Sequence, residues 1–201
     1  MPSPDKVGLS YGGVNSPRGL AIIRRNVVET GEVDPATFKK LTRTWFTLQH
    51  LEEYEPSMTV AAIGARLTQL FRGYPINSKQ RFQSVAVDCD DNSIVVDRLR
   101  DVISGSGIEL IRDMSISQDG RDKSTRQQDL IMKVRMAIEE GEFEVDETRF
   151  DTRWRDQLSK FDDMIPWRPA DLHLAAAICL AFWHVEREVT GWGYQPGFIC
   201  C

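Results

Sequence analysis

The stretch that decides the fold is Asp171 to Glu188, DLHLAAAICLAFWHVERE. Between Leu172 and Val185 it has no charged residue, unless one of its two histidines carries a proton. A helix that is apolar on every side must be buried on every side. A membrane-spanning helix needs about 20 apolar residues, and this stretch is shorter. We therefore predict either the central helix of a compact core or one half of a tight interface.

The composition is that of an ordinary globular protein. The chain has 201 residues, of which 41% are hydrophobic and 27% are charged. A chain of this length buries about 70% of its unfolded surface, so it needs no disulfide or metal to fold. The net charge is −5 and the pI is near 5.3, which argues against a broad electrostatic footprint for nucleic acid. We predict no cofactor.

The cysteines and the N-terminus indicate the compartment. The four cysteines form no CxxC pair and no cluster with zinc-ligand spacing. Cys179 lies inside the apolar stretch and is predicted to be a buried thiol. The N-terminus has no apolar core of the signal-peptide type, and no apolar run is long enough to span a membrane. We predict a cytoplasmic protein, or one inside a particle.

Composition divides the chain into three parts. Residues 1–19 are rich in Gly, Pro and Ser and are predicted to form an N-terminal arm. Residues 20–190 are predicted to form a single helix-rich globular domain. Residues 191–201 contain three glycines and a proline and are predicted to be an irregular tail.

Helical signals dominate the first half of the domain. Asp34 and Pro35 suit the start of a helix, and an apolar residue then recurs every three or four positions from Phe38 to Leu51. A second helix is predicted over 57–73, so the two should form an αα-hairpin. Residues 20–28 fit either a strand or a short helix. Further helices are expected over 94–103, 124–140, 146–161 and 171–188.

The middle of the chain carries the strand signals. Residues 81–87 alternate and become β-branched, and residues 108–116 are a second apolar run on the other side of helix 94–103. Strand, helix and strand suggest a parallel βαβ unit, although the second run could also be helical. The predicted fold class is α+β, predominantly helical, with about six helices and a small two- or three-stranded sheet from residues 81–116.

The pattern VAVDCDD at 85–91 resembles the first motif of the haloacid dehalogenase-like phosphatases. The resemblance implies that Asp88 is a nucleophile and Asp90 an acid/base, with Mg²⁺ offsetting the clustered negative charge. Ser115 or Ser117 would then supply the second motif and Lys123 the third. The alternative is a strand–turn–helix junction in which acidic residues cap the helix.

Two metal sites are excluded by spacing. The alternation of Asp88, Asp90 and Asn92 is similar to an EF-hand loop, which needs Gly at its sixth position and Glu at its twelfth. This chain has Ser93 and Leu99 there. The three histidines do not have helical ligand spacing with their acidic neighbours. Each is predicted to contact a backbone or carboxylate group at the edge of the core, and no metal site is predicted.

Two smaller features suggest other contacts. The densest cationic set near aromatic residues is a candidate nucleic-acid contact, although the acidic total does not favour this partner; it comprises Arg66, Arg72, Lys79 and Arg81. The terminal pair Cys200 and Cys201 is similar to the doubly prenylated end of Rab-type GTPases. That similarity implies a lipid anchor, which would be the chain's only membrane contact.

Aromatic residues are concentrated late in the chain, where Trp and Tyr suit an interface as well as a core. The candidate interface residues are Trp167, Phe182, Trp183, Trp192, Tyr194 and Phe198. We therefore predict a non-enzymatic structural, assembly or adaptor protein that forms a homo-oligomer through this segment or binds another protein. A viral matrix-, capsid- or nucleocapsid-associated protein has this character. The alternatives are the Mg²⁺-dependent phosphatase and the lipid-anchored peripheral membrane protein.

Overall fold

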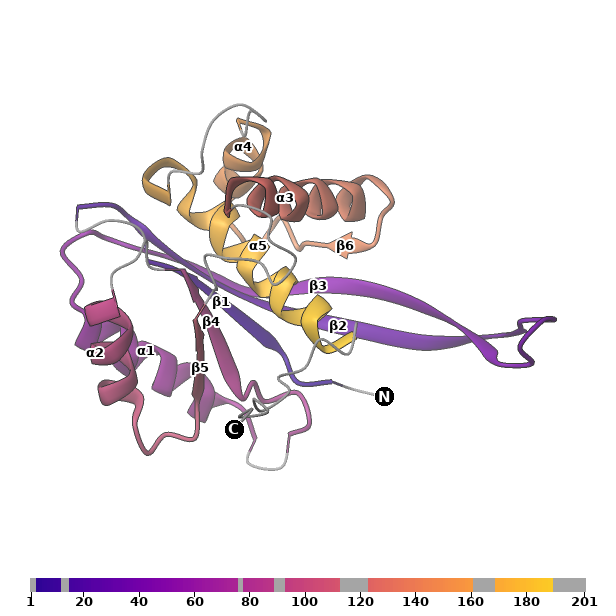
Figure 1. The fold of residues 1–201 in the computed structure, drawn as a ribbon, viewed down its shortest axis with the longest axis horizontal. Helices are drawn as coiled ribbons and strands as arrows, with labels where there is room; N and C mark the ends of the chain where they lie inside the picture. The colour runs from indigo at the N-terminus through magenta and orange to yellow at the C-terminus, as the bar shows by residue number, and fades with distance from the viewer. Residues whose placement is uncertain are drawn as a thin grey trace, which may run out of the picture.

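The computed structural model describes residues 3–11, 15–75, 78–88, 93–112, 123–160 and 169–189. A six-stranded mixed sheet with strand order β5-β4-β1-β2-β3-β6 lies at its centre (Figure 1). The strands are β1 (Lys6–Ser10), β2 (Arg18–Val33), β3 (Lys40–Tyr54), β4 (Ser84–Asp88), β5 (Glu109–Arg112) and β6 (Phe143–Glu144). The helices are α1 (Val60–Gly73), α2 (Ser93–Ile103), α3 (Lys123–Glu139), α4 (Arg153–Ser159) and α5 (Pro169–Val189).

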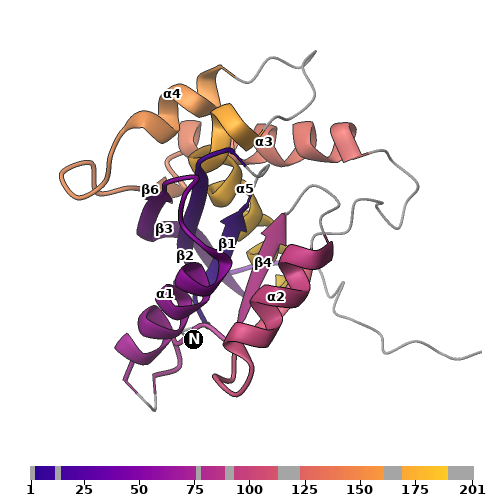
Figure 2. The same cartoon turned by 90° about the vertical axis from the view of Figure 1, so that its left-hand side faces the viewer.

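Helices cover both faces of the sheet. α1 and α2 pack on one face, and α5 packs on the other with α3 and α4 beside it (Figure 2). Each face has its own core cluster, one around Leu9, Ile63 and Leu99 and one around Trp154 and Ile178. A sheet covered on both faces needs strands that are apolar on both sides, which explains why β1 and most of β4 are buried throughout.

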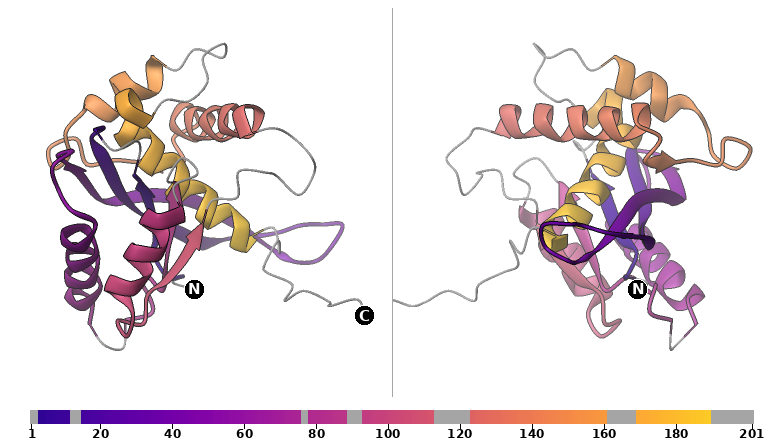
Figure 3. Two further views of the ribbon diagram at one scale, coloured as in Figure 1. Left: turned by 60° about the vertical axis from the view of Figure 1, so that its left-hand side comes forward. Right: turned by 90° about the vertical axis from the view of Figure 1, so that its right-hand side faces the viewer.

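The apolar stretch from Asp171 to Glu188 forms most of α5. Every residue from Leu174 to Phe182 is buried within the chain's own core, so the prediction of a central helix is confirmed. α5 crosses the sheet obliquely (Figure 3). Cys179 is a buried thiol as predicted, and burial raises its pKa to about 12.

The prediction of a predominantly helical chain with a small sheet is wrong. Residues 40–51, expected to be part of a helix, lie in β3, which pairs antiparallel with β2. The predicted αα-hairpin is therefore a strand followed by α1. An apolar residue every three or four positions also fits a strand whose two faces are both partly covered, and long-range pairing with β2 decides the outcome.

Several of the elements predicted after residue 57 occur in the structure. β4, α2 and β5 form the expected parallel unit. Helices also occur within the predicted ranges 57–73 and 146–161, although α4 is shorter than expected, and α3 begins and ends within one residue of its prediction. The structure describes no residue beyond 189, so the tail at 191–201 lies outside it.

The N-terminal segment contains the central strand of the sheet. Residues 6–10, which lie within the predicted arm, form β1 between β2 and β4. A five-residue strand beside several glycines gives too short a pattern to separate from a tail.

None of the helices in the described part of the chain is long and apolar enough to cross a membrane.

Candidate functional site

Four residues on four neighbouring strands form one row across the sheet. Asp88 of β4 pairs with Ser10 of β1, Ser10 pairs with Gly19 of β2, and Gly19 pairs with Glu53 of β3. Side chains alternate between the faces of a strand, so positions 8 and 10 share one face. Gly8 lies directly against the backbone of α5. The row therefore lies on the α5 face, where the carboxyl ends of the parallel strands β1 and β4 meet.

The first turn of α5 lies over this row. A Cβ atom on Gly19 would be 2.2 Å from the carbonyl oxygen of His173, so only glycine allows the helix to come this close. The backbone of Asp171 is two residues earlier, on the other side of a break in the helical path at Leu172. The other end of α5 lies near the start of β4, where His184 Nε2 is 2.9 Å from Ser84 Oγ. The row therefore lies beside the beginning of α5 and not beside its other end.

Ser10 has an unusual environment. Its side chain is fully buried, and among the described residues its Oγ has no hydrogen-bond partner. A buried hydroxyl without a partner costs about 1–3 kcal/mol, so such a group calls for an explanation such as a water molecule or an ion. An oxygen atom that lacks a partner next to the strand position of Asp88 suits a hydrated cation.

The residues at this end of the sheet fit Mg²⁺ or Mn²⁺. Carboxylate and hydroxyl oxygens are hard donors, and Mg²⁺ is typically bound by one or two carboxylates and several waters. Asp88 ends β4 and Asp171 lies near the start of α5, and the structure describes the backbone of both but not their side chains. Among the side chains that it does describe, no cluster of three His, Cys, Asp or Glu residues could hold a metal ion. By residue type and backbone position, the candidates for holding an ion here are Asp88, Asp171 and Ser10.

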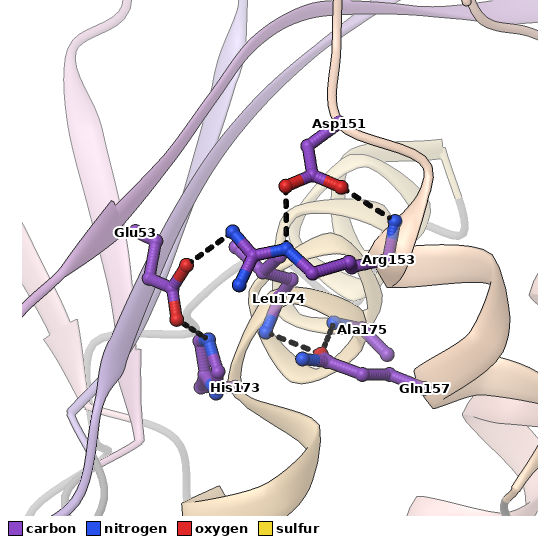
Figure 4. A network of polar contacts seen from close by, with 7 residues as sticks. All are labelled: Glu53, Asp151, Arg153, Gln157, His173, Leu174 and Ala175. Carbon is purple, nitrogen blue, oxygen red and sulfur yellow. Dashed lines mark hydrogen bonds and ion pairs between the residues drawn. The ribbon is translucent and has the colours of Figure 1, made fainter.

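A polar network fixes the start of α5 to its surroundings (Figure 4). His173 Nε2 lies 2.8 Å from Glu53 Oε1, and Arg153 donates from Nη2 to Glu53 Oε2 at 2.5 Å. Arg153 also binds Asp151, whose pKa is lowered by the backbone N–H and the guanidinium of Arg153. Gln157 Oε1 accepts hydrogen bonds from the two backbone N–H groups that follow His173, at 2.9 and 3.1 Å.

The predicted site residues are only partly brought together. The backbone of Asp88 is at the site, but Asp90, Ser115 and Ser117 lie outside the described residues. Lys123 begins α3. The prediction for the histidines holds for His184, which contacts the carbonyl oxygen of Val7. His50 and His173 lie within ion-pair distance of Glu52 and Glu53, but the Nε2 atoms of both have no hydrogen-bond partner among the described residues.

The predicted interface residues that are described pack inside the chain. Phe182 is buried and its ring lies 4.6 Å from that of Phe46, and Trp183 packs against the same core. The structure does not describe Trp167, Trp192, Tyr194, Phe198, Cys200 or Cys201. Of the cationic set, Arg66 pairs with Glu52, Arg81 stacks on Phe71 at 3.6 Å, and Arg72 and Lys79 are exposed. These four do not form a single binding surface with the row.

No sequence pattern singled out Ser10, Glu53 or Asp171. Gly8 and Ser10 alternate with Val7 and Leu9, which is a weak sign of a strand. Asp171 stands at the head of the apolar helix, where an acidic residue is also expected for favourable interaction with the helix dipole. Glu53 carried no local signal, because its place in the row follows from pairing between strands.

No protein-family model matches the chain, and no curated protein matches it in sequence. Its fold is similar to the human cytomegalovirus terminase nuclease domain, with 13% identity, coverage of 90% of this chain and 83% of that chain, and a TM-score of 0.51. A manganese-soaked structure of that domain gives 11% identity, the same coverage and a TM-score of 0.53. The fowlpox virus resolvase in complex with Holliday junction DNA gives 15% identity, coverage of 92% and 99%, and a TM-score of 0.47, too low to support an argument.

These similarities overturn the predicted function. The six-stranded sheet and its similarity to a terminase nuclease domain contradict the interpretation as a helical structural or adaptor protein of a viral particle. The phosphatase and lipid-anchor alternatives are set aside with it. What the likeness shows is the fold alone: a six-stranded mixed sheet with helices on both faces, similar to that of the terminase nuclease domain.

Proposed function

We propose that this chain is a divalent-metal-dependent nuclease that cleaves DNA. Its active site would lie at the carboxyl ends of β1 and β4. The observation that carries the proposal is the register of the row: Ser10 and Asp88 are neighbours at the ends of two parallel strands, and His173 of α5 lies over Gly19 in the same row. The fold of a terminase nuclease domain, for which a manganese-soaked structure exists, supports it.

The chain's own residues have defined parts in this proposal. Asp88 and Asp171 would hold Mg²⁺ or Mn²⁺, and the Ser10 hydroxyl would hydrogen-bond a water of its hydration shell. When bound, the metal supplies a Lewis acid that stabilises charge on the phosphate and lowers the pKa of bound water. In hydrolysis a water oxygen bonds to phosphorus, the phosphorus–oxygen ester bond breaks, and the leaving oxygen takes up a proton.

A DNA partner is compatible with the acidic chain. The sequence analysis disfavoured nucleic acid because the net charge is −5. A bound divalent ion would add +2 at the site, so the charge that a phosphate meets is set locally and not by the total. A homo-oligomer, the other predicted partner, stays a prediction.

The direct test is cleavage of DNA by the purified chain. Linear and supercoiled duplexes are incubated with Mg²⁺ or Mn²⁺, and a parallel series contains EDTA. We expect strand breaks that depend on the metal. A preparation that binds DNA but produces no breaks with either metal would contradict the proposal.

A second candidate function is DNA binding without cleavage, and Ser10 is the observation that favours it. A two-metal nuclease site clamps the attacking and leaving oxygens between two ions, and such ions are normally held by carboxylates. Here β1 contributes a neutral hydroxyl at the row. With one carboxylate fewer, a site could hold metal and phosphate and still cleave slowly.

Ser10→Asp tests whether the Ser10 side chain faces the metal, which both candidate functions require. Without metal, an unpaired carboxylate in this buried position should destabilise the fold by at least about 1–3 kcal/mol. Saturating Mn²⁺ should raise the melting temperature of the variant more than that of the wild type, because the new carboxylate would bind the ion. Metal at 100-fold excess over Kd adds about 2.7 kcal/mol to the free energy of unfolding. Thermal unfolding with Mn²⁺ and with EDTA measures this. An equal metal response in both proteins would show that Ser10 does not face the metal.

A further inference from the structure

We infer that the tip of the β2–β3 hairpin is a second contact for duplex DNA, in which Phe38 stacks on bases and Lys39 and Arg43 bind phosphates. The inference rests on the proposed function and adds to it a surface far from Asp88. Residues 26–44 are called the projecting hairpin below. This part of β2 and β3 extends away from the body of the molecule (Figures 1 and 3).

The projecting hairpin is a two-stranded ribbon. β1 pairs with β2 only as far as Ile23, and β6 pairs with β3 only at Phe46 and Thr47. From there to the tip, within the described part of the chain, the two strands pair only with each other. The major groove of B-DNA is about 12 Å wide and admits a two-stranded β-ribbon. The shape of the projecting hairpin therefore suits a duplex.

Phe38 is held in an unfavourable position at the tip. Its side chain is 84% exposed, the largest fraction among the exposed large hydrophobic residues that the structure describes. It is also the only described residue other than glycine with a positive φ, 54°, which is rare for a bulky side chain. The N–H of Phe38 donates to the carbonyl of Asp34 at 2.8 Å, which fixes this conformation. Strain and exposure at one aromatic residue indicate a role in binding.

The charges beside Phe38 favour DNA as the partner. Residues 35–51 include three cationic residues, Lys39, Lys40 and Arg43, and no Asp or Glu, although the whole chain is acidic. Lys40 is paired with Glu29 at 2.7 Å. Lys39 and Arg43 form no ion pair with any residue that the structure describes. An exposed aromatic ring next to unpaired cations is the combination that stacks on bases and binds phosphate.

The projecting hairpin also contains three acidic residues. Glu29 is engaged by its ion pair, and Asp34 accepts hydrogen bonds from a backbone N–H and a hydroxyl of its own turn, while Glu32 is exposed. Arg43 pairs with Val28, the residue before Glu29, and side chains alternate between the faces of a strand. Arg43 and Glu29 therefore lie on opposite faces of the ribbon, and Arg43 can meet a phosphate without Glu29 beside it.

The length of β3 sets where this contact falls on the DNA. Lys40 and Glu53, which belongs to the row, are 13 positions apart in β3. At about 3.3 Å per residue this is about 43 Å, which corresponds to about 13 base pairs of duplex at about 3.4 Å each. A duplex cut at the row therefore reaches the tip only if it continues for about 13 base pairs beyond the cut.

The contact needs no metal, so it is measured in EDTA with the full chain, by fluorescence anisotropy of a labelled duplex of about 30 base pairs, more than twice this span. We expect Phe38→Asn to raise the Kd at least about fivefold, the lower end of the loss for one stacked base. Asn tolerates a positive φ, so the melting temperature should stay the same or rise. Met136→Ala removes an exposed apolar side chain from α3 and should leave the Kd unchanged.

The salt dependence of binding tests the phosphate contact. Loss of one contact lowers the slope of the logarithm of affinity against the logarithm of salt concentration by about 0.9. We expect this change for Arg43→Gln. Arg98→Gln, which alters an exposed arginine of α2, is the matched control and should keep the wild-type slope. Equal slopes in the two variants would contradict the contact at Arg43.

Cleavage with Mn²⁺ tests the distance between the tip and the row. On the duplex of about 30 base pairs, Phe38→Asn should lower kcat/KM at least about fivefold. A duplex of about 10 base pairs, one helical turn, is too short to reach both places, so its cleavage should be unchanged. An equal loss on both lengths would contradict the inference.

Failure of the inference and failure of the proposed function give different results. If the wild type cleaves DNA and Phe38→Asn binds and cleaves the long duplex equally well, the contact is wrong and the proposed function stands. A changed solution mass of that variant would then assign the tip to contact between copies of the chain. A lower melting temperature of Phe38→Asn would overturn the inference too, because the ring would then serve the fold. If the wild type neither binds nor cleaves the duplex, the proposed function is wrong and the inference falls with it.

Discussion

Asp88→Asn is expected to lower the rate of Mn²⁺-dependent DNA cleavage by about 10²- to 10⁴-fold. The amide keeps the size of the side chain but removes the negative charge that holds the cation. A bound metal contributes several kcal/mol to stabilising the transition state, and each 1.36 kcal/mol corresponds to about a factor of ten. Single-turnover cleavage of a labelled duplex measures the rate. The melting temperature should change little, because Asn still occupies the end of β4.

Asp97→Asn is the matched control for this change. Asp97 lies on α2, is largely exposed and pairs with Arg100 three residues later. An exposed pair of this kind contributes at most about 1 kcal/mol to stability, so the variant should fold and cleave as the wild type does. Cleavage by Asp88→Asn at the rate of Asp97→Asn would show that the metal lies elsewhere.

Gly8→Ala is expected to have the largest effect on stability. Gly8 is in the central strand, where a Cβ atom would lie 2.2 Å from the carbonyl oxygen of Ala177 and 2.4 Å from the backbone nitrogen of Ala181. Both atoms belong to the backbone of a buried helix, so no side chain can turn away. α5 would have to move off β1, and we expect a loss of at least about 3 kcal/mol. Urea unfolding measures the change.

Gly73→Ala is the control. A Cβ atom on Gly73 has no neighbour within 4 Å, and the residue is the last of α1. Alanine there should leave stability unchanged or raise it by about 0.4–1 kcal/mol through the unfolded state. If the two variants unfolded at the same urea concentration, the close approach of α5 to β1 would be wrong.

Parts of the fold could be predicted because their signal is local. α5 is apolar around its whole circumference, which only a buried helix tolerates. The β4–α2–β5 unit combines an alternating run, a short amphipathic helix and a glycine-rich turn at 104–107. These features lie within a few residues of one another, so the sequence alone carries them.

β3 could not be predicted in the same way. From Phe38 to Leu51 the apolar spacing fits a helix, and Asp34 and Pro35 fit a helix start. In the structure Asp34 instead organises the hairpin turn, accepting hydrogen bonds from the N–H of Ala36 and the hydroxyl of Thr37. An Asp side chain forms the same hydrogen bonds at the start of a helix and in a hairpin turn. Only the pairing of β3 with β2 distinguishes the hairpin from the predicted helix.

The candidate site was hidden for a related reason. Ser10, Asp88, Asp171 and Glu53 are spread over more than 160 residues of sequence, and strand register brings three of them into one row. Asp88 was singled out because an acidic cluster follows an apolar strand. Its neighbours were not, because a lone serine and a lone glutamate carry no pattern. The phosphatase chemistry first assigned to Asp88 is not supported by the fold.

The most direct test of the central claim is a crystal structure of the full chain soaked in Mn²⁺, with anomalous difference maps to locate the ion. The account predicts a manganese peak between β4 and the first turn of α5, bound by a carboxylate oxygen of Asp88 at about 2.0–2.2 Å, the range of Mg²⁺-type oxygen ligands. It also predicts that the Ser10 hydroxyl contacts the ion or one of its waters. A peak elsewhere in the molecule, with none at Asp88, would contradict the assignment of this end of the sheet as the metal centre.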